Sequence, residues 1–212
     1  PLSLSLNQGG GFIQLAPNAS GPDLQLYFSP VSYTRAPAGV RPLMNPDPFP
    51  GFLMGFNPCK PTSVGNIQIS STDPLLPPKI YSNYLDTEYD KKMMIEGIRL
   101  IRRIANAPAL NSIIKDELAP GVGIKSETDI AKYIRQKAWS VFHPCSTCRM
   151  GSNPNVSVVD PKLRVHGVDN LRVVDASIFP TIPTGNINAP SIMVGEYASD
   201  IILKDARNQK GL

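Results

Sequence analysis

The stretch of this sequence richest in reactive side chains is HPCSTCRM, which runs from His143 to Met150. It holds one of the two histidines and, in Cys145 and Cys148, two of the three cysteines. Three kinds of site use such residues: a zinc site, a redox dithiol, or a stiff turn that orients a histidine as a general base. The rest of the chain has to decide among them.

Zinc and dithiol chemistry both lack partners elsewhere in the sequence. Pro-Cys-x-x-Cys is the second half of the zinc deaminase signature, but neither His143 nor His166 is followed by the x-Glu that this chemistry needs. Cys59 has no second cysteine or histidine beside it. A thioredoxin-like dithiol begins a helix, whereas RMGSNPN after Cys148 is typical of a loop. We therefore predict no metal site, and thiols that only fill space.

His143 fits the third kind of site. Pro144 follows it and restricts its backbone to an extended or turn conformation. Phe142 and Trp139 are near enough in sequence to supply an apolar wall. A fixed imidazole suits a general base, although a lone histidine is more often structural. On these residues alone both interpretations stay open.

A second polar cluster, PTGNINAP, places Asn186 and Asn188 directly before a predicted helix. The first turn of a helix offers free N–H groups and the positive end of the dipole, which favour an anionic or electron-rich ligand. The alternative is that Asn188 only caps the helix, and the two roles are compatible on one turn.

Hydrophobic patterning predicts the elements that must position these residues. GGGFIQLAP, DLQLYFSPV and SVGNIQISSTDP have the composition of strands. DTEYDKKMMIEGIRLIRRIANAP carries a helical stripe, capped by Asp86 or Thr87. SETDIAKYIRQKAW is a second helix that Ser126 caps, and NAPSIMVGEYASDIILKDA is a third with Pro190 in its first turn. Between the last two helices, VSVVDPKLRVHGVDNLRVVDASIFP contains three β-branched runs that predict short strands.

Composition limits the class of protein. The 212 residues have 42% hydrophobic and 18% charged side chains, as a globular chain does. The net charge of +4 comes from scattered Lys and Arg without an aromatic-interleaved stripe, which argues against nucleic-acid binding. We find no apolar run that could span a bilayer. The first residues, PLSLSLNQGGG, have neither the basic nor the apolar region of a signal peptide, and we expect Pro1 to be a cut end, so that a targeting signal upstream of it would not be visible here. Three cysteines favour a reducing compartment, so we expect a cytoplasmic protein.

Three segments in register, HPCSTCRMG, VVDPKLRVHGVDNLRVVDASIFP and GNINAPSIMVGEYASDII, resemble the C-terminal signature of the glucose–methanol–choline (GMC) oxidoreductases. The stretch from GNIQISSTDP to APAL also resembles their substrate domain, particularly in choline-dehydrogenase-like and hydroxymethylfurfural-oxidase-like members. The resemblance implies an α+β fold. Residues 1–138 would form a substrate domain with a mainly antiparallel sheet backed by helices. Residues 139–212 would supply the active-site loop, a strand over 171–176 and a last helix, and so complete a Rossmann-like FAD domain.

The resemblance also implies an FAD-dependent oxidation of an alcohol to an aldehyde. His143 falls on the catalytic base of the family, and Asn188 falls on its second active-site residue. The residues expected to contact the flavin are Phe142, Asp175, Ala176, Asn186, Ala189 and Pro190.

One departure from the family is large. GMC enzymes begin with a Gly-x-Gly-x-x-Gly strand–helix unit that seats the nucleotide. The only glycine-rich stretch here, Gly9 to Gly11, has neither that spacing nor a following helix. We therefore expect the C-terminal part of a larger enzyme, whose partner is its own N-terminal FAD-binding portion. Two alternatives stay open: a non-catalytic module that pairs with a separate flavin-binding chain, and a hydroxynitrile-lyase-type member of the same fold.

Overall fold

The structure, a computed structural model, describes residues 7–34 and 45–210 as two compact units. The first unit is drawn from residues 1–59 and 87–138, and the second from residues 60–86 and 139–212. Residues 60–86 therefore belong to the unit that holds the HPCSTCRM motif. The assignment of residues 1–138 to substrate binding and of 139–212 to flavin binding stays a prediction.

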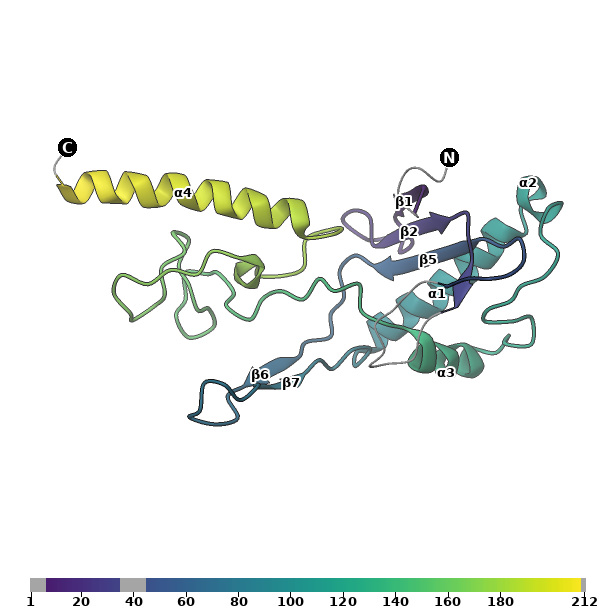
Figure 1. The fold of residues 1–212 in the computed structure, drawn as a ribbon, viewed down its shortest axis with the longest axis horizontal. Coiled ribbons are helices and arrows are strands. Elements are labelled where there is room, and N and C mark those ends of the chain that lie inside the picture. Colours follow the sequence, from purple (N-terminus) through teal and green to yellow (C-terminus); the bar gives the residue numbers. More distant parts are fainter. Residues whose placement is uncertain (1–6, 35–44, 211–212) are drawn as a thin grey trace. The chain divides into compact units, whose positions relative to one another are not determined.

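The first unit is built on a three-stranded antiparallel sheet with the order β1-β2-β5 (Figure 1). The strands are β1 (Gly9–Ile13), β2 (Leu24–Ser29) and β5 (Leu53–Pro58), and Leu26 of β2 pairs with Gly11 and Phe56 on its two neighbours. A short pair, β3 (Tyr33–Thr34) and β4 (Asn45–Pro46), accompanies it. The glycine run that fails as a phosphate loop is thus an edge strand.

Three helices follow the sheet in this unit: α1 (Glu88–Ala105), α2 (Pro108–Asn111) and α3 (Glu127–Lys137). Thr87 caps α1 and Ser126 caps α3, each by accepting the N–H of the residue three positions on, as predicted. Helix α1 contacts both β5 and α3. The buried apolar residues of the unit are Leu24, Cys59, Met93, Ile95, Ile98, Ile130 and Ile134.

Gly97 marks the place where α1 meets the sheet most closely. A Cβ atom at Gly97 would overlap the ring of Phe56, whereas one at Gly195, in the C-terminal helix, would meet nothing within 4 Å. We therefore expect Gly97→Ala to destabilise the protein by about 1–3 kcal/mol through overpacking. Gly195→Ala should instead stabilise it by about 0.5–1 kcal/mol through helix propensity. Urea unfolding of both variants measures the contrast, and equal stabilisation by the two would contradict this packing.

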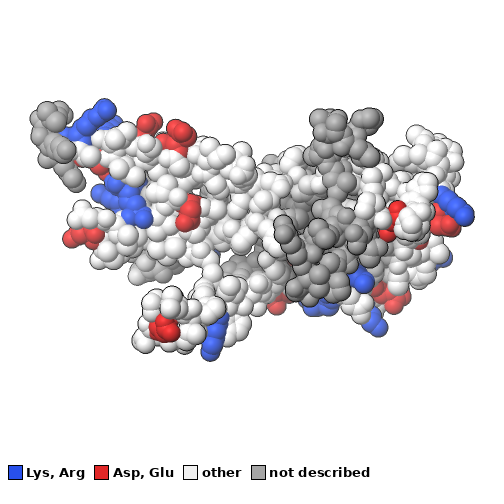
Figure 2. Space-filling view, in the orientation of Figure 1, with Lys and Arg blue, Asp and Glu red and all other residues white. Residues whose placement is uncertain are grey.

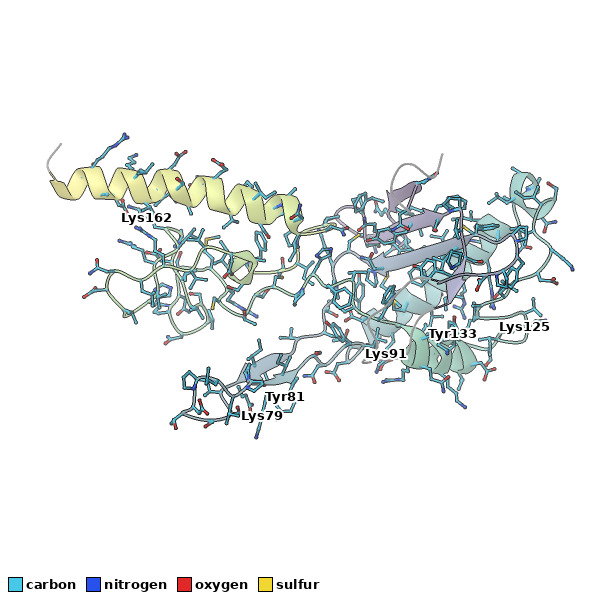
Figure 3. The ribbon with its side chains drawn as sticks, in the orientation of Figure 1. Lys79, Tyr81, Lys91, Lys125, Tyr133 and Lys162 are labelled. Carbon is cyan, nitrogen blue, oxygen red and sulfur yellow. The ribbon has the colours of Figure 1, made fainter. Side chains whose placement is uncertain are left out.

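The second unit has little regular structure apart from one hairpin and one long helix (Figure 1). The hairpin joins β6 (Asn66–Gln68) to β7 (Lys79–Tyr81), and all six residues are exposed. The side chains of Lys79 and Tyr81 extend outward from β7 (Figure 3). A 3₁₀ turn, η1 (Ala176–Ile178), and the helix α4 (Asn188–Lys210) follow.

The strands predicted between residues 156 and 176 are wrong in detail. The β-branched runs form only isolated bridges, which join Val159 to Met150 and Val165, and Arg164 to Arg172. Turns break each run, and Leu163 interrupts the middle one with a left-handed backbone (φ 65°). The buried cluster beneath them consists of Val159, Leu163, Ile178, Val194 and Ala198, and the last two come from α4. Packing of side chains in this cluster therefore stabilises the segment, in place of the strand-to-strand hydrogen bonds that the pattern predicts.

The fold class itself is confirmed, because helices combine with antiparallel sheets throughout the part of the chain that the structure describes. No helix there has the length and apolar composition required to cross a bilayer. On the face drawn in Figure 2, basic and acidic side chains are interspersed.

Candidate active site

The motif HPCSTCRM leads directly into the 3₁₀ turn η1. The amide of Cys148 donates to the carbonyl of Ser177 at 3.0 Å, and the amide of Met150 donates to that of Ile178 at 2.7 Å. Helix α4 contacts η1 in turn. Three segments that the sequence singled out, residues 143–150, 175–178 and 186–190, therefore lie together in one unit.

His143 is half-buried and hydrogen-bonded to a residue of the polar cluster PTGNINAP. Its Nε2 lies 2.7 Å from the Nδ2 atom of Asn186. An amide nitrogen can only donate, so Nε2 of His143 is the acceptor of this bond. An acceptor nitrogen of an imidazole is also an atom that can take a proton from a hydroxyl group, as a general base does.

The contact of His143 with Asn186 differs in one respect from the expected pairing with Asn188. Asn188 is the first residue of α4 and is exposed. Asn186, two residues earlier, lies before the helix, and its side chain reaches the imidazole. Both asparagines lie on the same turn, so the roles of Asn188 as catalytic partner and of Asn186 as flavin contact stay predictions.

The start of α4 has the features of a site for an electron-rich group. Asn188 and Ala189 are exposed, Pro190 is half-buried, and the first turn contains no acidic residue. The amide and the hydroxyl of Ser191 both donate to the carbonyl of Ile187, at 2.9 and 2.7 Å, which fixes the turn. Free N–H groups and the helix dipole fit the pyrimidine edge of a flavin ring. The residues present are therefore compatible with FAD.

Asp175 and Ala176 lie at the start of η1. Asp175 is exposed, and its Oδ1 atom accepts the amide of Ser177 at 2.8 Å, which caps the 3₁₀ turn. Ala176, half-buried, is the first residue of that turn. Asp175 thus has a structural role as the cap of this turn, and its expected contact with the flavin stays a prediction.

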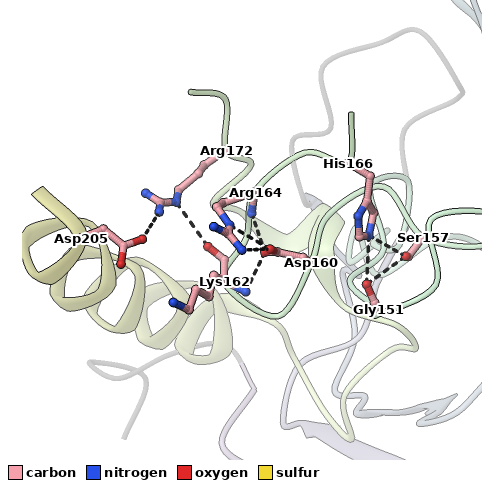
Figure 4. Close-up of polar contacts among 8 residues, drawn as sticks. All are labelled: Gly151, Ser157, Asp160, Lys162, Arg164, His166, Arg172 and Asp205. Carbon is pink, nitrogen blue, oxygen red and sulfur yellow. Dashed lines mark hydrogen bonds and ion pairs between the residues drawn. The ribbon is translucent and has the colours of Figure 1, made fainter. Parts of the chain in front are cut away.

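A polar triangle holds the end of the motif in place (Figure 4). The Nε2 atom of His166 lies 3.1 Å from both the hydroxyl of Ser157 and the carbonyl of Gly151, and that hydroxyl donates to the same carbonyl at 3.0 Å. The second histidine of the chain is therefore a structural residue that anchors Gly151.

Asp160 holds together the turn formed by residues 160–164 (Figure 4). It accepts the amides of Lys162 and Arg164 at 2.8 and 3.0 Å, and the Nε of Arg164 at 2.8 Å. Burial raises the pKa of the Asp160 carboxyl, but these hydrogen bonds outweigh it, so the pKa lies below its usual value. Arg172 donates to Asp205 of α4 at 2.5 Å. The ion pair between Arg172 and Asp205 thus joins α4 to the segment before η1.

Two residues that no sequence pattern indicated also reach this site. Tyr84, after the hairpin, donates its hydroxyl to Ser140 at 3.2 Å, and Ser140 accepts the amide of Phe142 at 2.9 Å.

The two cysteines of the motif, Cys145 and Cys148, are free thiols. Among the residues that the structure describes, no three His, Cys, Asp or Glu side chains are grouped as a metal would require.

Comparison with known proteins defines the class. The family model described as GMC oxidoreductase matches residues 61–195, so the chain belongs to the GMC oxidoreductase family, whose members use FAD. Over 154 residues it is 44% identical to an oxygen-dependent choline dehydrogenase of Vibrio vulnificus (strain YJ016), covering 72% of this chain and 28% of that one. Over 207 residues it is 39% identical to an alcohol dehydrogenase (acceptor) of Pseudomonas putida, covering 96% and 36% respectively.

Comparison with solved structures supports the same family assignment. A formate oxidase of Aspergillus oryzae, studied for FAD modification, superposes with a TM-score of 0.76 at 26% identity. The match covers 89% of this chain and 33% of that chain. The chain thus spans about a third of the length of the relatives that it matches.

Proposed function

We propose that this chain is the C-terminal part of an FAD-dependent enzyme that oxidises the CH–OH group of an alcohol to the aldehyde. The observation that carries the proposal is the 2.7 Å contact between Nε2 of His143 and the side-chain amide of Asn186, directly before the exposed start of α4. Membership of the GMC family and relatives named choline dehydrogenase and alcohol dehydrogenase support the same reaction.

The residues of this chain supply the acid–base half of the chemistry. The alcohol hydroxyl takes the place of the Asn186 amide at Nε2 of His143, and its proton moves to that atom as the C–O double bond forms. Asn188 donates its side-chain amide to the oxygen as negative charge develops there. FAD, when bound, would supply the two-electron oxidation at the carbinol carbon.

The residues that would hold the flavin ring come from three segments of the unit that contains His143. Phe142 directly precedes that histidine, Asp175 and Ala176 lie at the start of η1, and Asn186, Ala189 and Pro190 lie directly before or in the first turn of α4. The N–H groups and the helix dipole at the α4 N-terminus would favour an electron-rich part of the ring bound there. The nucleotide part of FAD requires a glycine-rich unit, which the N-terminal portion of the same enzyme would contribute.

The proposal is tested by mixing the complete, FAD-loaded enzyme anaerobically with a series of primary alcohols. We expect at least one alcohol, choline among those tried, to bleach the visible flavin absorbance and to yield the aldehyde in equal amount. Cleavage of a cyanohydrin without flavin bleaching would instead identify a lyase. Failure of every alcohol to reduce the bound flavin would favour a binding module and contradict the proposal.

A further inference from the structure

Left-handed backbone conformations gather at two places in the second unit. Among the described residues other than glycine, six have a positive φ: Asn83, Leu85, Phe142, Ser146, Leu163 and Asn170. Two of them flank Tyr84, and two lie in or directly before the His143 motif. Such a conformation costs about 1–3 kcal/mol and persists only where the surroundings impose it. Contacts from the surrounding residues must therefore impose this conformation at both places.

The turn that carries Tyr84 is hydrogen-bonded to the segment directly before β6. The side-chain amide of Asn83 donates to the carbonyl of Val64 at 3.1 Å. The backbone amide of Asp86 donates to the hydroxyl of Ser63 at 2.9 Å. Asn83 and Leu85 have φ values of 49° and 59°, so the backbone is left-handed on both sides of Tyr84. This backbone sets the direction of the Tyr84 side chain.

That direction takes the Tyr84 hydroxyl to Ser140, 3.2 Å away. The same serine oxygen accepts the amide of Phe142 at 2.9 Å, and Phe142 has a φ of 61°. The ring of Phe142 meets that of Trp139 edge to face, with centroids 6.5 Å apart and planes at 81°. Phe142 and Trp139 are 76% and 56% exposed in this chain, so burial alone does not fix these rings.

We propose that Tyr84 is a positioning residue of the alcohol site, acting through Ser140 on Phe142. The hydrogen bonds hold Phe142 in its left-handed conformation, so that its ring and that of Trp139 form one wall beside His143. This wall receives the carbon substituent of the alcohol and keeps the hydroxyl in line with the imidazole. This role rests on the proposed function, whereas the Tyr84–Ser140–Phe142 contact does not.

The contact is tested without turnover by fluorine NMR of the complete enzyme carrying 4-fluorophenylalanine in place of Phe142. The ring current of Trp139 shifts this signal, and Trp139→Leu supplies the reference for a lost wall. We expect Tyr84→Phe to shift the fluorine signal toward its position in Trp139→Leu, or to broaden it. Tyr81→Phe, a matched change on β7, should leave it in place. An identical signal in Tyr84→Phe and in the unaltered enzyme would overturn the proposal.

The role is tested by steady-state kinetics with the same alcohol. Tyr84→Phe should raise KM about fivefold, which is the factor expected for one lost hydrogen bond, with a smaller change in kcat. Ser140→Ala should do the same, and Ser140→Thr, which keeps the hydroxyl, should restore KM. Equal losses with Ser140→Ala and Ser140→Thr would overturn the relay through the hydroxyl. An unaltered enzyme that oxidises no alcohol would contradict the proposed function, and the fluorine signal would still decide the contact.

Discussion

His143→Ala in the complete, FAD-loaded enzyme will slow the reduction of the flavin by an alcohol by about 10²-fold or more. The variant removes the Nε2 atom that takes the hydroxyl proton, and general-base catalysis contributes about 10²–10⁴-fold. Without that acceptor the hydride would have to leave a neutral alcohol, which places positive charge on the oxygen. Anaerobic stopped-flow measurement of flavin bleaching gives the rate of this single step.

The other histidine of the chain provides the matched control. His166 contacts Ser157 and Gly151 and has no role in the proposed reaction. His166→Ala should therefore lower the melting temperature but change flavin reduction only a few-fold. Added imidazole should restore part of the rate to His143→Ala and none to His166→Ala. Flavin reduction by His143→Ala at a near-normal rate, with FAD bound, would exclude this histidine as the base.

The local sequence determines the helices and their caps. In α1 the apolar residues recur at helical spacing, Thr87 caps the start, and both features act within one or two turns. Ser126 does the same for α3. The β-branched runs before η1 satisfied the strand pattern equally well, yet they form only bridges. A strand needs a neighbour along its whole length, and propensity alone does not supply one.

The candidate site was predictable to the level of the segment but not of the atom. Pro144 and the polar turn before α4 identified His143 and the two asparagines as candidates, and only the family resemblance favoured a functional role for them over a structural one. Which asparagine meets the imidazole depends on the path of the turn, and Asn186 is the one that reaches Nε2. The relay from Tyr84 was beyond sequence reasoning, because it depends on the left-handed backbone of Leu85, which its residue type disfavours.

We expect the largest effect on stability from a substitution in the buried cluster that contains Val159. Val159 has no exposed surface, and its carbonyl accepts the amide of Gly151, at the end of the HPCSTCRM loop, at 2.9 Å. Val159→Asp would place an unpaired charge in the buried cluster that seats α4, at a cost of about 3–5 kcal/mol. Since whole domains are stable by only about 5–15 kcal/mol, we expect this unit to unfold or to melt far earlier.

Val156, on the same loop, is 66% exposed and provides the comparison. Val156→Asp introduces the same charge three positions away, where water can solvate it, and should change stability by at most about 0.5 kcal/mol. Chemical unfolding and retained flavin content measure both variants. Because Val159 connects the cluster to Gly151, loss of the cluster should release the His143 loop, so Val159→Asp should also lose its flavin. Equal stability of the two variants would mean that this cluster is not what positions the catalytic loop.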